Sequence, residues 1–214
     1  MVKALVSVAA LVVASGASAA VVGVDLGTGA PPAFLGGYSM SPFGDDGREV
    51  IGDVNGVGVA EGAPFGDLGF SHTLSHRQIG LGWSTWSNGY EGDVYYNSTN
   101  DLPIPRGDGS GFFDVTLAMP VGTAAFYLYA ESDPFGLHTI TAFSGNTVLT
   151  LEVEGQGGAN GYGFFTDDGS TIDFITVSAD VGFAIGEFGA ARVPAPGALA
   201  LVGMGGLVGL RRRR

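Results

Sequence analysis

The chain has 214 residues, of which 21 are acidic and 9 are basic, and its formal net charge is −12. Such an acidic protein repels the phosphate backbone, which excludes nucleic acid as an expected partner. The sequence contains no cysteine, which excludes disulfides, thiol chemistry and zinc–thiolate sites.

The first 19 residues have the pattern of a secretory signal peptide. Lys3 precedes the apolar residues 4–13, and small residues then lead to Ala17-Ser18-Ala19, a cleavage site of the A-x-A type. We expect cleavage between Ala19 and Ala20. The apolar run is too short for a membrane span. The alternative to a signal peptide is a buried N-terminal helix.

Residues 20–192, here termed the passenger, are long enough to form one domain with its own core. All 21 acidic residues but only four of the nine basic ones lie in it, which gives it a net charge of −17. An acidic exported domain stays soluble and can collect divalent cations through its carboxylates.

Residues 24–69 are rich in glycine and contain four prolines, so we expect long loops and an edge strand there. Residues 53–58 resemble the start of a calcium-binding loop, but Val57 occupies the third ligand position. No cofactor is therefore predicted. Four aspartates could still meet around a calcium ion in the fold, although turn formation is the preferred explanation for each of them: Asp45, Asp46, Asp53 and Asp67.

His72 and His76 have the spacing of a metal pair on a helix. Phe70, Leu74 and Ile79 around them instead indicate extended chain. Residues four apart on a strand lie about 13 Å from each other, so no shared zinc ion, and no metal site, is predicted.

Asn88-Gly89 predicts a two-residue β-hairpin turn. In the register that this turn imposes, one face collects Trp83, Tyr90 and Val94 as a core face. The other face collects the candidate glycan-binding residues, because an aromatic plate beside carboxylates suits a sugar ring: Trp86, Tyr95, Glu91 and Asp93. The alternative is an ordinary outer sheet face with a partly covered tryptophan.

The passenger is predicted to be all-β. Nine segments have alternating or buried strand patterns: residues 79–87, 90–97, 112–118, 124–130, 139–143, 147–153, 161–166, 172–178 and 183–188. The connections at residues 144–146 and 167–169 have the composition of turns between adjacent antiparallel strands. No amphipathic helix is evident, and we predict an antiparallel two-sheet β-sandwich of the jelly-roll type.

No sequence motif of catalysis is present. The chain lacks a G-x-S-x-G elbow, a P-loop and a complete G-x-G-x-x-G. Hydrolysis by paired carboxylates would depend on their separation in the fold, and no catalytic residue is predicted. Arg106-Gly107-Asp108 spells an adhesion tripeptide but is explained as a polar turn.

Residues 193–214 combine a short proline motif, an apolar run and a basic end. The motif is Val193-Pro194-Ala195-Pro196, and the apolar residues 197–210 precede Arg211, Arg212, Arg213 and Arg214. A run of 14 glycine-containing residues is shorter than the roughly 20 that span a bilayer, and the arginines hold it on the cytoplasmic side. We expect transient insertion into the inner membrane by a short apolar helix; a plain tail anchor is the alternative.

This tripartite layout resembles the PEP-CTERM sorting signal of Gram-negative bacteria, with Ala195 in place of the usual glutamate. The resemblance implies processing by an exosortase, a membrane protease, and delivery to the cell surface or the exopolysaccharide matrix. Residues 126–188 are also similar in pattern to PEP-CTERM passengers, which implies a lectin-like sandwich.

Three functions follow, in order of preference. The first is a non-enzymatic exported protein of the cell surface or biofilm matrix that associates noncovalently with exopolysaccharide. The second is a lectin-like glycan-binding module. The third is a glycoside hydrolase.

Overall fold

The computed structural model describes residues 21–48, 50, 56–97 and 113–193. These residues form fifteen β-strands and no helix, which confirms the all-β prediction. The predicted signal peptide, Asp53, the tripeptide at 106–108 and the C-terminal segment after Val193 lie outside the described residues.

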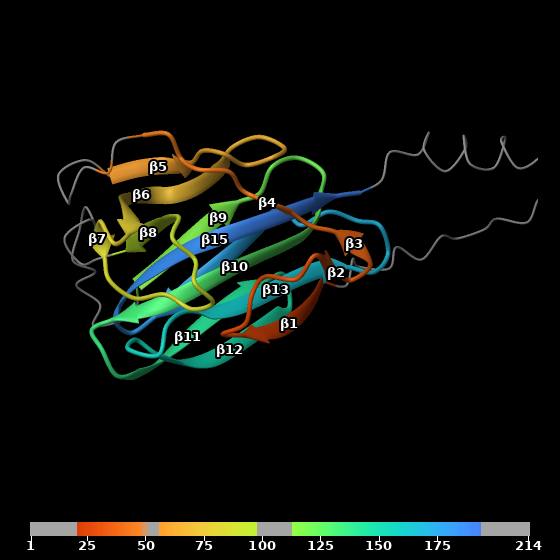
Figure 1. Cartoon of the computed structure of the whole chain (residues 1–214). Coiled ribbons are helices and arrows are strands. Elements are labelled where there is room, and N and C mark those ends of the chain that lie inside the picture. The colour runs from red at the N-terminus through yellow and green to blue at the C-terminus, as the bar shows by residue number, and fades with distance from the viewer. Residues whose placement is uncertain (1–20, 49, 51–55, 98–112, 194–214) are drawn as a thin grey trace, which may run out of the picture.

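One large sheet contains most of the strands (Figure 1). Its strand order is β1 (Val21–Gly27), β13 (Asn160–Thr166), β10 (Thr123–Asp133), β15 (Gly182–Arg192), β8 (Asp93–Asn97), β6 (Leu68–Ile79), β9 (Phe113–Ala118), β14 (Phe174–Ala179), β11 (Leu137–Ser144) and β12 (Thr147–Glu154). Three short strands join it at the side: β4 (Ser41–Pro42), β5 (Gly56–Ala60) and β7 (Gly82–Trp83). A separate small sheet pairs β2 (Phe34–Leu35) with β3 (Tyr38–Ser39). Among the described strands every pairing is antiparallel except that of β6 with β7.

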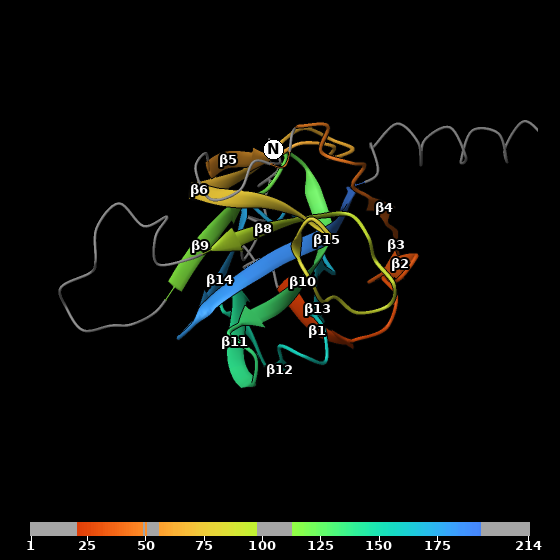
Figure 2. The same ribbon diagram turned by 60° about the vertical axis from the view of Figure 1, so that its left-hand side comes forward.

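The large sheet curls until its two end strands lie side by side (Figures 1 and 2). The Thr147 hydroxyl at the start of β12 donates to the carbonyl oxygen of Val21 in β1. Apolar side chains from both halves of the sheet fill one core, and they include Leu74, Leu117, Phe126, Leu128, Ile140, Phe164, Ile175 and Ile185. The curled sheet is therefore sandwich-like, and successive side chains along its strands point alternately to the core and to an outer face.

The outer face of β10 carries Tyr127 and Tyr129 between glycines of the neighbouring strands. Tyr127 lies opposite Gly163 of β13 and Gly189 of β15, and Tyr129 lies opposite Gly161 and Gly186. A Cβ built on Gly189 would come 2.2 Å from the Tyr127 ring, and one on Gly161 would come 2.7 Å from the Tyr129 ring. Glycine in these strands thus makes room for tyrosine rings that lie flat on the sheet.

A second layer covers these tyrosines. Leu35 and Met40 from the N-terminal segment, with Trp86 from the loop before β8, form a separate apolar cluster with Tyr127 and Tyr129. Figure 2 shows this loop crossing the outer side of β15 and β10. The glycines of β13 and β15 therefore make room for tyrosines on an outer face that this second layer buries.

The predicted segments from residue 90 onward each contain a strand, and the extended chain around His72 and His76 is confirmed as part of β6. The prediction for residues 79–87 is wrong, because β6 ends at Ile79 and only Gly82–Trp83 is strand. Gly80 and Gly82 have φ values of 81° and 91°, and these left-handed conformations break the strand.

The predicted hairpin is wrong in its pairing, although its turn is present. The Tyr90 amide donates to the Ser87 carbonyl at 3.2 Å, and Asn88 and Gly89 have φ values of 49° and 77°. The chain before the turn is loop, and β8 pairs with β6 and β15 instead.

The two other turn predictions have opposite outcomes. The connection at 144–146 is confirmed, since Ser144 pairs with Thr147 in the β11–β12 hairpin. The connection at 167–169 is not a hairpin, because it leads from β13 to β14, and these strands do not pair.

Candidate functional site

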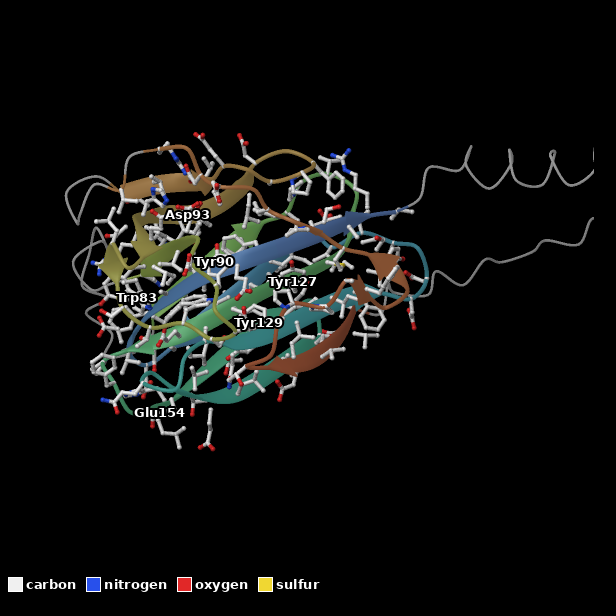
Figure 3. All side chains as sticks on the ribbon, in the orientation of Figure 1. Trp83, Tyr90, Asp93, Tyr127, Tyr129 and Glu154 are labelled. Carbon is white, nitrogen blue, oxygen red and sulfur yellow. The ribbon has the colours of Figure 1, made fainter. Side chains whose placement is uncertain are left out.

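A cavity of about 120 Å³ lies between the outer layer and the strands β8, β15 and β10. The N-terminal segment, the loop before β8, β8, β10 and β15 all contribute to its wall. Its lining residues are Pro31, Pro42, Phe43, Gly44, Glu61, Tyr90, Asp93, Tyr95, Tyr127, Glu187 and Phe188. Figure 3 shows how Asp93, Tyr90 and Tyr127 follow one another across β8, the loop and β10.

Glu187 enters the cavity from a β-bulge. The register of β10 against β15 shifts between Tyr127 and Tyr129, which lie opposite Gly189 and Gly186, so two residues of β15 oppose one of β10. Glu187 has a φ of 50°, a left-handed conformation that L side chains rarely adopt. Such backbone strain costs on the order of 1–3 kcal/mol and gathers at functional sites, which directs attention to this carboxylate.

The Glu187 carboxylate is held by two donors of the loop. Trp86 Nε1 and Asn88 Nδ2 donate to Oε2 at 2.9 and 3.1 Å. Burial raises the pKa of Glu187, and these two hydrogen bonds offset part of that increase. Its other oxygen, Oε1, makes no hydrogen bond within the described residues and is available to a ligand.

Asp93 is fixed by neighbours on both sides. Its Oδ1 lies 2.9 Å from His76 Nε2, and its Oδ2 accepts a hydrogen bond from the Asp46 amide at 2.7 Å. The Tyr90 hydroxyl donates to the Asp93 carbonyl oxygen at 3.0 Å. This carboxylate is therefore a rigid, negatively charged part of the wall.

A polar network supports that wall from behind. Asp46 forms an ion pair with Arg48 and accepts the Tyr95 hydroxyl at 2.7 Å. Burial alone would raise the pKa of Asp46, but the hydrogen bonds from Arg48 and Tyr95 outweigh it and hold this pKa well below the usual value. Burial and the bond to Asp46 raise the pKa of Tyr95, so its phenol stays protonated.

This network predicts a pH dependence of stability. Because the folded-state pKa of Asp46 lies below its ordinary value of 3.8, the unfolded chain binds more protons than the folded chain between these two pKa values. The stabilisation is present above pH 3.8 and is lost as the pH falls through that value towards the folded-state pKa. We expect Asp46→Asn to destabilise the protein by about 1–3 kcal/mol at pH 6, since it removes hydrogen bonds to a charged group.

Urea denaturation at pH 6 and pH 3 measures this effect. The difference between wild type and Asp46→Asn should shrink at pH 3. Asp180→Asn, at an exposed position, should leave stability unchanged at both pH values. A constant difference between wild type and Asp46→Asn at the two pH values would contradict the assignment.

Tyr127 supplies an unused donor. Its side chain is 2% exposed and lines the cavity, yet its hydroxyl has no hydrogen-bond partner within the described residues. Burial, with a contribution from the Glu187 charge, raises the pKa of Tyr127 to about 12. Tyr127 and Glu187 both line the cavity, and no hydrogen bond joins them.

The structure separates the four candidate glycan-binding residues. Asp93 and Tyr95 line the cavity, but Tyr95 is only 2% exposed, with its ring stacked on Phe188. Trp86 reaches the site through Glu187, and Glu91 is exposed and does not line the cavity. The four do not share one exposed face, because the hairpin that would align them does not form.

Sequence reasoning missed the residues that complete the cavity, which are Glu61, Tyr90, Tyr127 and Glu187. One signal was available for Glu187: it is the acidic residue in an otherwise apolar stretch and lies between Gly186 and Gly189. Glycines that flank a polar residue in a strand often mark a bulge or a close approach.

No metal centre is evident in the described residues, where no three His, Asp or Glu side chains are grouped to hold an ion. His72 and His76 bond separately, to Asn97 at 3.0 Å and to Asp93 at 2.9 Å. Asp46, one of the carboxylates considered for calcium, is instead paired with Arg48.

A second cavity of about 150 Å³ lies beside Arg77, Trp83 and Asp133. Trp83 cannot turn freely towards it, since its Nε1 donates to buried Glu131 at 2.7 Å. The Asp133 carboxylate there accepts the Tyr96 hydroxyl at 2.7 Å. Ser132 also lines this second cavity, and its hydroxyl has no hydrogen-bond partner among the described residues. The first cavity is the stronger candidate because Glu187, a carboxylate on a strained bulge, lines it.

No family model matches the chain, and no curated protein is significantly similar to it. In the part of the chain that the structure describes, no helix is long and apolar enough to cross a membrane.

Proposed function

We propose that this chain is an exported, non-enzymatic protein of the cell surface or exopolysaccharide matrix, sorted by its PEP-CTERM-like C-terminal segment. The pair of terminal patterns, residues 1–19 and 193–214, carries this proposal. The passenger forms a jelly-roll-like β-sandwich that acts after an exosortase removes the C-terminal segment, and it associates noncovalently with exopolysaccharide.

Fractionation of the native host tests this proposal. Wild-type protein should appear outside the inner membrane. A variant with Pro194 and Pro196 replaced by alanine should remain in the membrane fraction. A variant with two exposed passenger changes, such as Glu91→Gln with Asp180→Asn, should be exported as wild type. Equal export of all three would contradict a sorting role for the motif.

The cavity favours a second function, glycan binding. It combines aromatic rings, two rigid carboxylates and an unused phenol, the groups that proteins place around sugar rings. Trp86 bonds to Glu187, so a ligand there should change its fluorescence. We expect saccharide-dependent quenching that disappears in Trp86→Ala and persists in Trp83→Phe. Quenching that survives loss of Trp86 would place the ligand elsewhere.

A glycoside hydrolase ranks third. Asp93 has both oxygens engaged by His76 and by the Asp46 amide, which leaves it poorly placed as a nucleophile. A panel of chromogenic glycosides tests this, and turnover that Glu187→Gln abolishes would replace the non-enzymatic proposal.

A further inference from the structure

The cavity has a one-sided charge. Its ionisable lining groups are the carboxylates Glu61, Asp93 and Glu187 and three tyrosines, and none of the described Lys, Arg and His residues lines it. Of the three lining carboxylates, Glu61 is the one that Arg48 approaches, with Nε 3.6 Å from Oε1. The main ion pair of Arg48 is with Asp46, which does not line the cavity. The Asp93 carboxylate also bonds to His76. The excess of carboxylates in the wall disfavours anionic ligands and attracts a cationic one.

The unpaired polar atoms of the wall can serve a cationic group. Among the described residues, neither the Tyr127 hydroxyl nor Glu187 Oε1 has a hydrogen-bond partner, and both residues line the cavity. Trp86 and Asn88 hold the other carboxylate oxygen, Oε2. The Tyr127 hydroxyl and Oε1 can both accept a hydrogen bond, and an ammonium group has three protons to donate. The aromatic residues Tyr90 and Tyr127 line the cavity as well, and aromatic rings attract cations.

The size of the cavity fits one monosaccharide unit. One water molecule needs about 10–15 Å³ of cavity volume, measured as the space open to a water-sized sphere. The 120 Å³ found here therefore accommodates on the order of ten non-hydrogen atoms, close to a hexosamine ring.

We propose that the cavity binds a saccharide unit that carries a free, protonated amine, as in a deacetylated hexosamine polymer, with the amine between Glu187 and Tyr127. The inference rests on the proposed glycan binding and specifies its ligand. The negative charge of the whole passenger also attracts a polycationic chain, but that attraction has no preference for this cavity.

Calorimetry with three trisaccharides of the same linkage tests the inference: fully deacetylated chitotriose, its N-acetylated form and cellotriose. We expect the deacetylated trimer to bind at least about tenfold more tightly than the others, the loss typical of one charge-assisted hydrogen bond. Raising the salt concentration or deprotonating the amine at high pH should weaken its binding.

Tyr127→Phe is the decisive variant, because it changes no charge and breaks no hydrogen bond of the folded chain. It should keep the wild-type melting temperature and lose about tenfold in affinity for the deacetylated trimer. Glu187→Gln and Glu91→Gln form a pair with the same change of net charge. Only the first should weaken binding, since Glu91 does not line the cavity.

Each outcome decides a different point. Equal binding of all three trimers overturns the amine and leaves glycan binding intact. Tight binding of the deacetylated trimer that Tyr127→Phe leaves unchanged overturns the site and reduces the effect to general charge. Absence of binding by any trimer overturns both the inference and the proposed glycan binding.

Discussion

Replacing Glu131 by alanine is expected to destabilise the folded chain by about 2–4 kcal/mol. Glu131 lies on β10 with 0% exposure and accepts hydrogen bonds from Trp83 Nε1 at 2.7 Å and from the Thr85 hydroxyl at 2.6 Å. Alanine leaves Trp83 Nε1 without a partner, and a buried, unpaired donor costs about 1–3 kcal/mol. The half-buried Thr85 hydroxyl loses its shorter hydrogen bond but keeps the Gly155 carbonyl oxygen at 3.3 Å, which adds about 1 kcal/mol to the loss. Urea denaturation followed by tryptophan fluorescence measures the loss.

Two variants control for the loss of charge. Glu131→Gln keeps an acceptor oxygen without the charge, so it should lose less stability than Glu131→Ala. Glu91→Ala removes an exposed carboxylate and should stay within about 0.5 kcal/mol of wild type. If Glu131→Ala were as stable as Glu91→Ala, Glu131 would not anchor the loop before β8.

Gly189→Ala is expected to cost about 1–3 kcal/mol and to disrupt the cavity. The added Cβ would lie 2.2 Å from the Tyr127 ring, so the ring must leave its place on the sheet. Displacement of the ring moves the Tyr127 hydroxyl, which belongs to the wall of the cavity. The measurements are the melting temperature and the binding of the deacetylated trimer, both of which should fall.

Gly58→Ala is the matched control. Gly58 lies in β5, and a Cβ built there meets no atom within 4 Å. It should leave stability and binding unchanged or slightly improve stability, because alanine restricts the unfolded chain. If Gly189→Ala behaved like Gly58→Ala, the close packing of Tyr127 on β15 would be wrong.

The strands were predictable because their signal is local. Residues 149–153 alternate between apolar and polar, and the glycine-containing turn at 144–146 fixes the β11–β12 hairpin. The failure at residues 79–87 has a physical cause of longer range. Glu131 and Glu187, about fifty and one hundred residues later in the chain, bind Trp83 and Trp86 and hold this segment as a loop.

The candidate site was predictable only in part. Asp93 and Tyr95 were identified from their strand, and both line the cavity. Tyr127 and Glu187 lie in segments whose sequence pattern indicates buried strands. Only the pairing of β10 with β15 brings them to one cavity. The bulge at Glu187 depends on the register of that pairing, which no local pattern encodes.

The most direct test of the proposed sorting and export is the intact mass of the protein isolated from its native host, with and without a working exosortase. The proposal predicts a mature product that begins near Ala20, lacks the arginine tail and lies outside the membrane, and a longer membrane-bound form without the exosortase. A protein that keeps Arg211 to Arg214 in the inner membrane of wild-type cells would contradict the proposal and identify a tail-anchored domain.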